Sequence, residues 1–217
     1  MSQFQTVPNV LLRIERLKVL RDLGFLSHDK VTIFDRLAQL ASDVIGAPVS
    51  LVSMVAADYQ FFKSQVGLPE PWASKRSTPL SHSLCQHVVA TNTPLIIDDA
   101  RQVDFLQTNR AIPDLNVIGY LGIPLTLSDG NSLGSFCVID NKPRRWSELE
   151  VSIMAELAEI ITQDIDLRAM ARLNRGHQQT LEQFEAQLEK LLDQTDTSLA
   201  HADFLTQVRT LRRTLNV

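Results

Sequence analysis

The sequence predicts an α+β domain in which helices pack mainly on one face of an antiparallel sheet. Two pairs of β-rich segments lead to this view. Val49–Val55 pairs with Gln60–Val66 across a short loop, and Val117–Leu125 pairs with Ser132–Ile139 across an Asp-Gly turn. Helical patterns lie before, between and after these hairpins and do not alternate with single strands as repeated βαβ units, which argues against a parallel sheet.

Two amphipathic helices are expected before the first hairpin. Apolar residues recur at helical spacing from Val10 to Leu20, and Gly24 follows as a C-terminal cap. A second helix is expected over Asp29–Ile45, because its apolar residues lie on one face and Gly46 follows it. We therefore place an N-terminal helix within residues 1–24, ahead of the sheet domain.

A third helix is expected over Ser81–Thr91, in the stretch of the chain that is richest in reactive side chains. Ser81 would serve as its N-cap, and a short strand is expected at Leu95–Ile97. Residues on a helix advance by about 100° each, so Ser81 and Cys85 share a face. His82 lies three residues before Cys85, but the sequence offers no third ligand, and we expect no metal site.

The last predicted helix begins at a Ser147-x-x-Glu150 capping box and continues as a heptad pattern. Such a stripe is marginal on a single helix in water and needs a partner, so we expect a parallel homodimer. Residues 168–217 then form a helical dimerisation segment. The a and d positions of the heptads are Leu167, Met170, Asn174, His177, Leu181, Phe184, Leu188 and Leu191.

The overall composition is that of a soluble globular protein, with 44% hydrophobic and 21% charged residues in 217. The net charge is −4 without blocks of like charge, so we expect neither a nucleic-acid partner nor a basic membrane anchor. No apolar run reaches the roughly 18 residues of a membrane span. The two cysteines, Cys85 and Cys137, lie far apart, which favours a reducing cytoplasm.

Three segments, Phe61–Pro71, Thr78–Ala100 and Gly119–Trp146, resemble bacterial GAF domains in order and spacing. The likeness is greatest to the subgroup found beside histidine kinases and diguanylate cyclases. It implies a GAF/PAS-like sheet of five or six antiparallel strands in residues 25–167. It also implies that the N- and C-terminal helices pack on one face and that a ligand cavity lies over the other.

The resemblance places a cavity between the sheet and the helix at Ser81–Thr91. Strand alternation puts Phe62 and Ser64 on the same face of the sheet. Asp99 ends the adjacent strand, where it either contacts a ligand or caps the following turn. The expected lining residues are Phe62, Ser64, Ser81, Cys85, Asp99 and Tyr120.

The function predicted from these features is that of a non-catalytic sensory and dimerisation module. It would bind a small molecule of unknown identity, require no cofactor, and act on a histidine kinase or diguanylate cyclase. Cys85 is expected to be a small buried apolar residue, with a redox-reactive thiol as the alternative.

Three other functions stay open. A free methionine sulfoxide reductase would need several cysteines on loops, and this chain has two. A bilin photoreceptor would attach its pigment at a cysteine followed directly by histidine, but here Gln86 separates Cys85 from His87. The third alternative is a dimerisation domain that binds no ligand.

Overall fold

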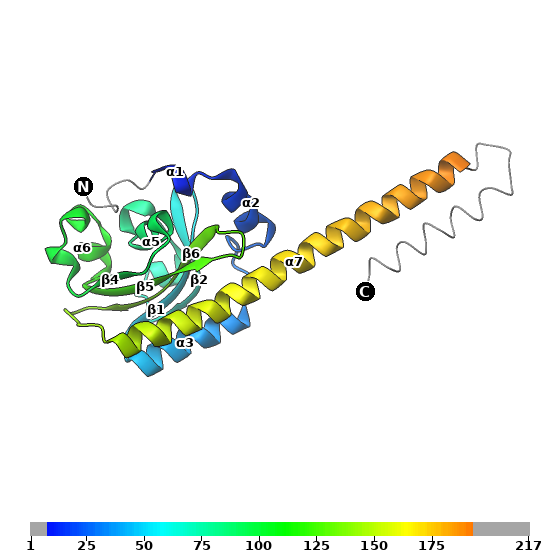
Figure 1. The fold of residues 1–217 in the computed structure, drawn as a ribbon. Helices are drawn as coiled ribbons and strands as arrows, with labels where there is room; N and C mark the ends of the chain where they lie inside the picture. Colours follow the sequence, from blue (N-terminus) through cyan, green and yellow to red (C-terminus); the bar gives the residue numbers. More distant parts are fainter. Residues whose placement is uncertain (1–7, 193–217) are drawn as a thin grey trace. The chain divides into compact units, whose positions relative to one another are not determined.

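The computed structural model describes residues 8–192 and has a six-stranded sheet at its centre. The strand order is β3-β2-β1-β6-β5-β4, and all neighbouring strands are antiparallel, which confirms the predicted fold class (Figure 1). The strands are β1 (Val49–Val55), β2 (Tyr59–Val66), β3 (Ser77–Pro79), β4 (Leu95–Ile97), β5 (Gly119–Thr126) and β6 (Ser132–Asp140).

Helices cover both faces of this sheet. The helices are α1 (Pro8–Leu11), α2 (Ile14–Asp22), α3 (Thr32–Ile45), α4 (Trp72–Lys75), α5 (Cys85–Thr91), α6 (Ala111–Leu115) and α7 (Glu148–Leu192). The predicted first helix is therefore two helices, because Arg13 leaves the helical conformation between them, with φ −59° and ψ 122°. Three short 3₁₀ turns lie at Leu80–His82, Ala100–Gln102 and Asp104–Leu106.

One face of the sheet carries α3 and the first part of α7, and we call this side the helical layer (Figure 1). Leu20 of α2 belongs to the same apolar cluster. Apolar side chains from α3 and α7 pack there on β1, β5 and β6, as the predicted terminal helices should. Buried members include Phe34, Leu37, Met54, Leu121, Phe136, Leu157 and Ile161.

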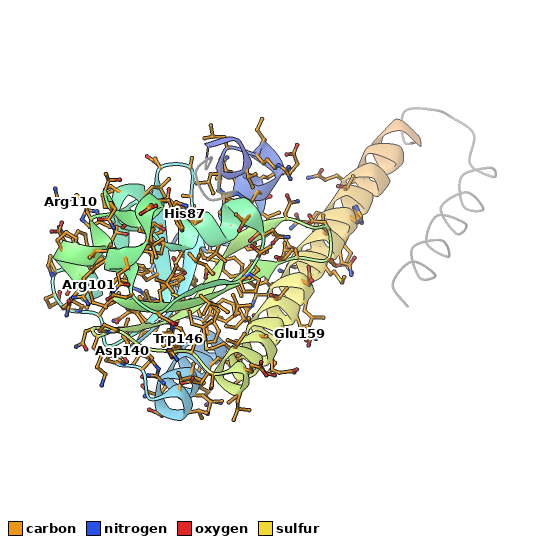
Figure 2. All side chains as sticks on the ribbon, turned by 60° about the vertical axis from the view of Figure 1, so that its left-hand side comes forward. His87, Arg101, Arg110, Asp140, Trp146 and Glu159 are labelled. Atoms are coloured by element: carbon orange, nitrogen blue, oxygen red, sulfur yellow. The ribbon has the colours of Figure 1, made fainter. Side chains whose placement is uncertain are left out.

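The opposite face carries α1, α5 and α6, and we call it the pocket layer. Its buried apolar residues include Leu11, Leu51, Phe62, Leu84, Val88, Leu106 and Ile139. Figure 2 shows how densely side chains fill both layers, with His87 on the α5 side and Glu159 on α7.

Arg16 of α2 joins the N-terminal helices to the sheet. Its guanidinium is fully buried and donates to the carbonyl oxygens of Leu11, in α1, and Val55, at the end of β1. Burial lowers the pKa of Arg16 to about 10. The two bonds hold the junction between α1 and α2 at the end of β1, a central strand.

A β-bulge interrupts the alternation of side chains in β2. Val52 pairs with Ser64, whereas the next residue, Ser53, pairs with Phe62, so Lys63 is an extra residue. Lys63 and Ser64 consequently both point into the helical layer. The Lys63 ammonium donates to the carbonyls of Gly24 and Ser27, and the Ser64 hydroxyl donates to a carboxylate oxygen of Asp35 at 2.7 Å.

α7 extends from Glu148 to Leu192 as one helix of 45 residues. The predicted capping box at its start is confirmed, because the Ser147 amide donates to Glu150 and the Glu150 amide donates to the Ser147 hydroxyl. The chain divides into two compact units, and the boundary falls within this helix. The units are Met1–Arg168 and Ala169–Val217.

The heptad positions of α7 are exposed as far as the structure describes them. Leu167 and Met170 are 68% and 54% exposed, and Asn174 and His177 also face solvent. The side chains of Leu181, Phe184, Leu188 and Leu191, and all residues beyond 192, lie outside the described part of the chain. The predicted partner helix therefore stays a prediction.

Candidate functional site

A small cavity lies in the pocket layer, between the sheet and the segment that contains α5. Its volume is about 30 Å³, which is room for a few water molecules. The exposed Pro69 and the half-buried Leu68 and Leu115 form the end that faces solvent. Apolar side chains from β1, β2, β6, α6 and the segments between the elements make up most of the wall, and its polar members are Gln60, His82, Cys85 and Tyr120.

Cys85 lines the cavity, and the second cysteine of the chain, Cys137, lies behind it. The sulfur of Cys85, the first residue of α5, lies 3.9 Å from that of Cys137 in the centre of β6. The hydroxyl of Tyr120 donates to the Cys85 sulfur at 3.3 Å and lies equally close to the hydroxyl of Ser135. All four side chains are buried. No sequence pattern predicted that the two cysteines meet.

These contacts shift the pKa values of the two thiols in opposite directions. A hydrogen bond from Cys137, assisted by one from Tyr120, outweighs the effect of burial and lowers the pKa of Cys85 to about 7. The same bond, together with burial, raises the pKa of Cys137. Burial also raises the pKa of Tyr120, which therefore stays a hydrogen-bond donor. Cys85 is the thiol of the pair that ionises first.

Gly122 allows Tyr120 to reach Cys85. The two residues are two apart on β5 and share a face of the sheet, and the tyrosine ring lies across the glycine. A Cβ atom at Gly122 would stand 2.4 Å from the Tyr120 hydroxyl oxygen and 2.7 Å from the ring. The absent side chain thus provides the space that the buried phenol occupies.

Replacing this glycine should therefore disturb the site directly. We expect Gly122→Ala to cost about 1–3 kcal/mol of unfolding free energy, because the buried ring must move. In a Tyr120→Ala background the same change should be neutral or slightly stabilising, since alanine is preferred to glycine within a strand. Urea denaturation of the four proteins in this double-mutant cycle measures the coupling. An equal cost in both backgrounds would contradict the packing described.

A hydrogen-bonded group of polar residues borders the cavity beside α6. The Nε2 atom of His82 lies 3.0 Å from a carboxylate oxygen of Asp114, and Arg110 donates to the same oxygen. Bonds from Arg110 and then from His82 lower the pKa of Asp114. The group connects the 3₁₀ turn at Leu80–His82 to α6 and holds His82 at the cavity wall.

Three of the six predicted lining residues, Phe62, Cys85 and Tyr120, do line the cavity. The placement of Ser64 there was wrong, because the bulge at Lys63 turns Ser64 into the helical layer. The alternation rule fails wherever one strand has an extra residue.

The placements of Ser81 and Asp99 were also wrong. Ser81 is exposed in the 3₁₀ turn before α5, so it shares no helix face with Cys85 and is not the N-cap. Leu84 is the N-cap residue, and the hydroxyl of Ser83, one residue earlier, accepts a bond from the Gln86 amide in the first turn of α5. Asp99 caps the turn at Ala100–Gln102 and pairs with Arg101, which is the alternative considered for it.

Sequence reasoning missed Gln60 and Cys137 as members of the site. Gln60 is buried, and its amide donates to the Thr78 hydroxyl while its oxygen accepts from Ser53 and Ser83. Alternation along β2 would have placed Gln60 on the same face as Phe62. Alternation along β6 shows which residues share a face with Cys137. Which layer that face meets depends on the order of the strands in the sheet, and hairpin signals do not supply that order.

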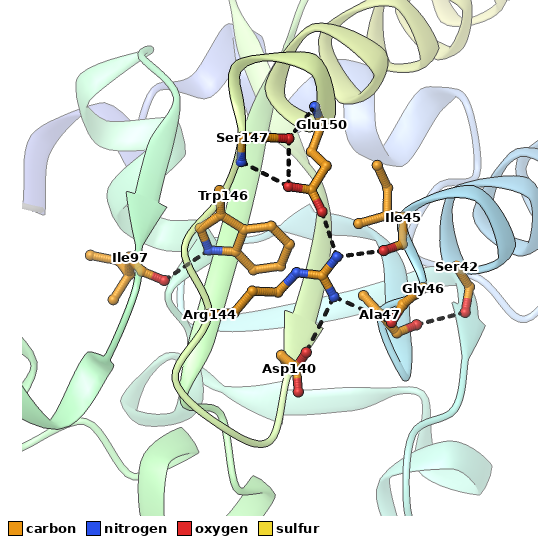
Figure 3. Close-up of polar contacts among 10 residues, drawn as sticks. All are labelled: Ser42, Ile45, Gly46, Ala47, Ile97, Asp140, Arg144, Trp146, Ser147 and Glu150. Carbon is orange, nitrogen blue, oxygen red and sulfur yellow. Dashed lines mark hydrogen bonds and ion pairs between the residues drawn. The ribbon is translucent and has the colours of Figure 1, made fainter.

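Arg144 connects the end of the sheet to the start of α7 (Figure 3). Its guanidinium donates to the carbonyls of Ile45 and Gly46 at the end of α3 and pairs with Asp140 and Glu150. It also lies over the ring of Trp146, 4.7 Å from the centroid. One side chain thus joins α3, β6 and the capping box of α7.

Trp146 extends this connection to the pocket layer. Its indole N–H donates to the carbonyl of Ile97 at 3.0 Å, and Ile97 pairs with Tyr120 across β4 and β5. Trp146 directly precedes Ser147, which caps α7 (Figure 3). A continuous set of bonded residues therefore leads from a cavity residue to the first turn of the long helix.

Comparison with known proteins identifies the class of domain. The family model for the GAF domain matches residues 29–165. The chain therefore belongs to the GAF domain family, as the resemblance of its motifs implied. Within residues 8–192, no helix is both long and apolar enough to cross a bilayer, and no group of three or more His, Cys, Asp or Glu side chains is arranged to hold a metal.

One curated relative is a cyclic di-GMP phosphodiesterase of Pseudomonas aeruginosa, 26% identical over 141 residues. The match covers 64% of this chain and 23% of that protein, so the chain spans about a quarter of the relative's length.

Solved structures share the fold at low identity. A GAF domain of a phosphoenolpyruvate-protein phosphotransferase from Acinetobacter is 16% identical with a TM-score of 0.52, covering 74% of this chain and 98% of that one. The PixJ GAF domain of Thermosynechococcus elongatus, in its blue-light-absorbing form, is 17% identical with a TM-score of 0.54, covering 74% and 95%. The free methionine-R-sulfoxide reductase of Neisseria meningitidis is 13% identical with a TM-score of 0.51, covering 70% and 89%.

Proposed function

We propose that this chain is a non-catalytic regulatory GAF module that binds a small molecule in the pocket layer and passes the change to α7. The observation that carries the proposal is the bonded route from the cavity to the long helix. Tyr120 lines the cavity, its strand neighbour Ile97 bonds Trp146, and Trp146 adjoins the cap of α7. A shift of β4 or β5 on ligand binding would move the residues that start the helix.

The size of the cavity limits the ligand. A volume of about 30 Å³ suits a molecule of a few heavy atoms, and a larger one would have to displace the rim at Leu68, Pro69 and Leu115. The wall is mostly apolar with a few polar groups, as is usual for small-molecule sites. We therefore propose a small, largely neutral ligand.

Thermal denaturation with small neutral probes tests ligand binding. We expect one or more short alcohols, amides or sulfoxides to raise the melting temperature by mass action. Leu115→Trp should abolish the shift by blocking the rim, whereas Leu115→Ala should retain it. Native mass spectrometry of the purified chain checks for a molecule that is carried through purification. If no probe shifts the melting temperature and nothing is retained, the ligand-free dimerisation module becomes the better proposal.

The partner side of the proposal rests on the exposed stripe of α7. Leu167, Met170 and Leu173 are more than half exposed, and a second copy of the chain in a parallel coiled coil would cover the first two. The similarity to a cyclic di-GMP phosphodiesterase supports a role in bacterial signalling. We propose a histidine kinase or diguanylate cyclase as the type of output enzyme, either on the same polypeptide or as a partner.

Dimer formation can be tested with a matched pair of charge variants. We expect light scattering to report a dimer at micromolar concentration for the unchanged chain. Leu167→Glu combined with Met170→Glu should give a monomer, because carboxylates would have to be buried at the helix interface. Arg172→Glu, on the outward face of the same helix, should stay dimeric. A monomeric unchanged chain would exclude the proposed interface.

A further inference from the structure

The paired cysteines carry an inference that does not depend on a ligand. Cys85 and Cys137 are 52 residues apart in the chain, yet their sulfurs lie 3.9 Å from each other because α5 packs on β6. A disulfide requires the sulfurs to come within about 2.05 Å. The sulfurs must therefore approach each other by about 2 Å, through side-chain rotation and a shift of α5.

Only one of the two sulfurs can be reached from the cavity. Cys85 is among the lining residues and is 3% exposed, whereas Cys137 is fully buried behind it. A cavity of about 30 Å³ admits an oxidant of two oxygen atoms, such as hydrogen peroxide, and excludes bulkier disulfide reagents. The polar wall atoms of Gln60, His82 and Tyr120 provide hydrogen-bonding partners for such a molecule.

We propose that Cys85 and Cys137 form a peroxide-oxidisable pair that closes into a disulfide between α5 and β6. In the first step the Cys85 thiolate attacks one peroxide oxygen, the O–O bond breaks, and Cys85 becomes a sulfenic acid while the leaving hydroxide takes up a proton to give water. In the second step the Cys137 sulfur attacks the sulfur of that sulfenic acid. A second water leaves with the Cys137 proton, so two thiols and one peroxide give one disulfide and two waters.

The surroundings of Cys85 favour the first step. The reactive species of cysteine is the thiolate, and the donors Cys137 and Tyr120 lower the pKa of Cys85 to about 7. Cys137 already lies against the sulfur that it must attack. The product would fix the first turn of α5 to the central strand of the sheet, which makes the cavity wall responsive to oxidants.

The test begins with the reduced full chain. It is treated with hydrogen peroxide under native conditions, then unfolded, alkylated and analysed by mass spectrometry. We expect both alkylation sites to disappear together with a mass loss of two hydrogen atoms, and a Cys85–Cys137 peptide to appear after digestion. Intact free thiols after a peroxide excess that oxidises glutathione would overturn the proposal, and so would disulfides formed only between chains.

Two alanine variants assign the order of events. Cys137→Ala should leave Cys85 as a sulfenic acid, which dimedone traps when the oxidised chain is unfolded in its presence, and Cys85→Ala should leave Cys137 reduced. Circular dichroism checks that each variant is folded. If a variant does not fold, disulfide formation in the unchanged chain decides the proposal. Equal reactivity of Cys137 in Cys85→Ala would refute the assigned roles. The measurement reports thiol chemistry alone, so its failure leaves the proposed ligand binding to be judged by the thermal shifts.

Discussion

Gly134→Ala should prevent the domain from folding stably, with a loss of at least about 3 kcal/mol of unfolding free energy. A Cβ atom at Gly134 would lie 2.0 Å from the carbonyl oxygen of Ser53 and 3.0 Å from the Cα of Met54. Both are backbone atoms of β1, the central neighbour of β6, and cannot rotate away. Overpacking usually costs 1–3 kcal/mol where side chains can adjust, and here the strands themselves would have to separate.

Gly130→Ala is the matched control, in the turn that joins β5 to β6. Nothing lies within 4 Å of its added Cβ, and only the positive φ of 85° opposes the change. Such a conformation costs an alanine about 1 kcal/mol. Urea denaturation compares the two variants with the unchanged chain. Similar urea midpoints for Gly134→Ala and Gly130→Ala would show that the space between β6 and β1 at Gly134 can accommodate a methyl group.

Arg144→Ala should be the most damaging change at the start of α7, costing about 3 kcal/mol. Removing one partner of a buried ion pair leaves the other charge uncompensated, and the Asp140 side chain is only 3% exposed. The end of α3 would also lose two hydrogen bonds to its carbonyls. Denaturant unfolding gives the loss, and amide exchange in the first turn of α7 shows whether the cap loosens.

Two further variants separate the causes of this loss. Arg144→Lys keeps the positive charge but loses the planar fork that reaches several acceptors, so it should fall between the unchanged chain and Arg144→Ala. Adding Asp140→Asn to Arg144→Ala should recover part of the stability by removing the unpaired charge. If Arg144→Ala costs less than about 1 kcal/mol, the network in Figure 3 does not hold the helix to the sheet.

Local patterns predicted most of the fold because each element has its own sequence signature. Alternating β-rich runs and an Asp-Gly turn marked both hairpins, and Ser147 with Glu150 marked the start of α7. β3 was missed, since Ser-Thr-Pro at the sheet edge has no apolar alternation. The break between α1 and α2 was missed because Arg13 leaves the helical conformation within an otherwise continuous apolar period.

The site was harder to predict because its members depend on contacts between distant segments. A single bulge at Lys63 reversed the face assigned to Ser64, and no local signal marks that extra residue. The helix containing Cys85 begins four residues later than the pattern suggested, which removed Ser81. The meeting of Cys85 with Cys137 depends on which strands lie at the centre of the sheet, and hairpin signals leave that order open.

The buried guanidinium of Arg16 has a consequence for how the N-terminal helices open. Short terminal helices usually fray independently of the rest of a domain, and their amides then exchange rapidly. Arg16 would have to give up the carbonyls of both Leu11 and Val55 before α2 could detach. Detachment of α2 would also expose Leu20, which is completely buried in the helical layer. α2 and the end of β1 should therefore open as one cooperative unit, with amide protection in α2 close to that of the central strands.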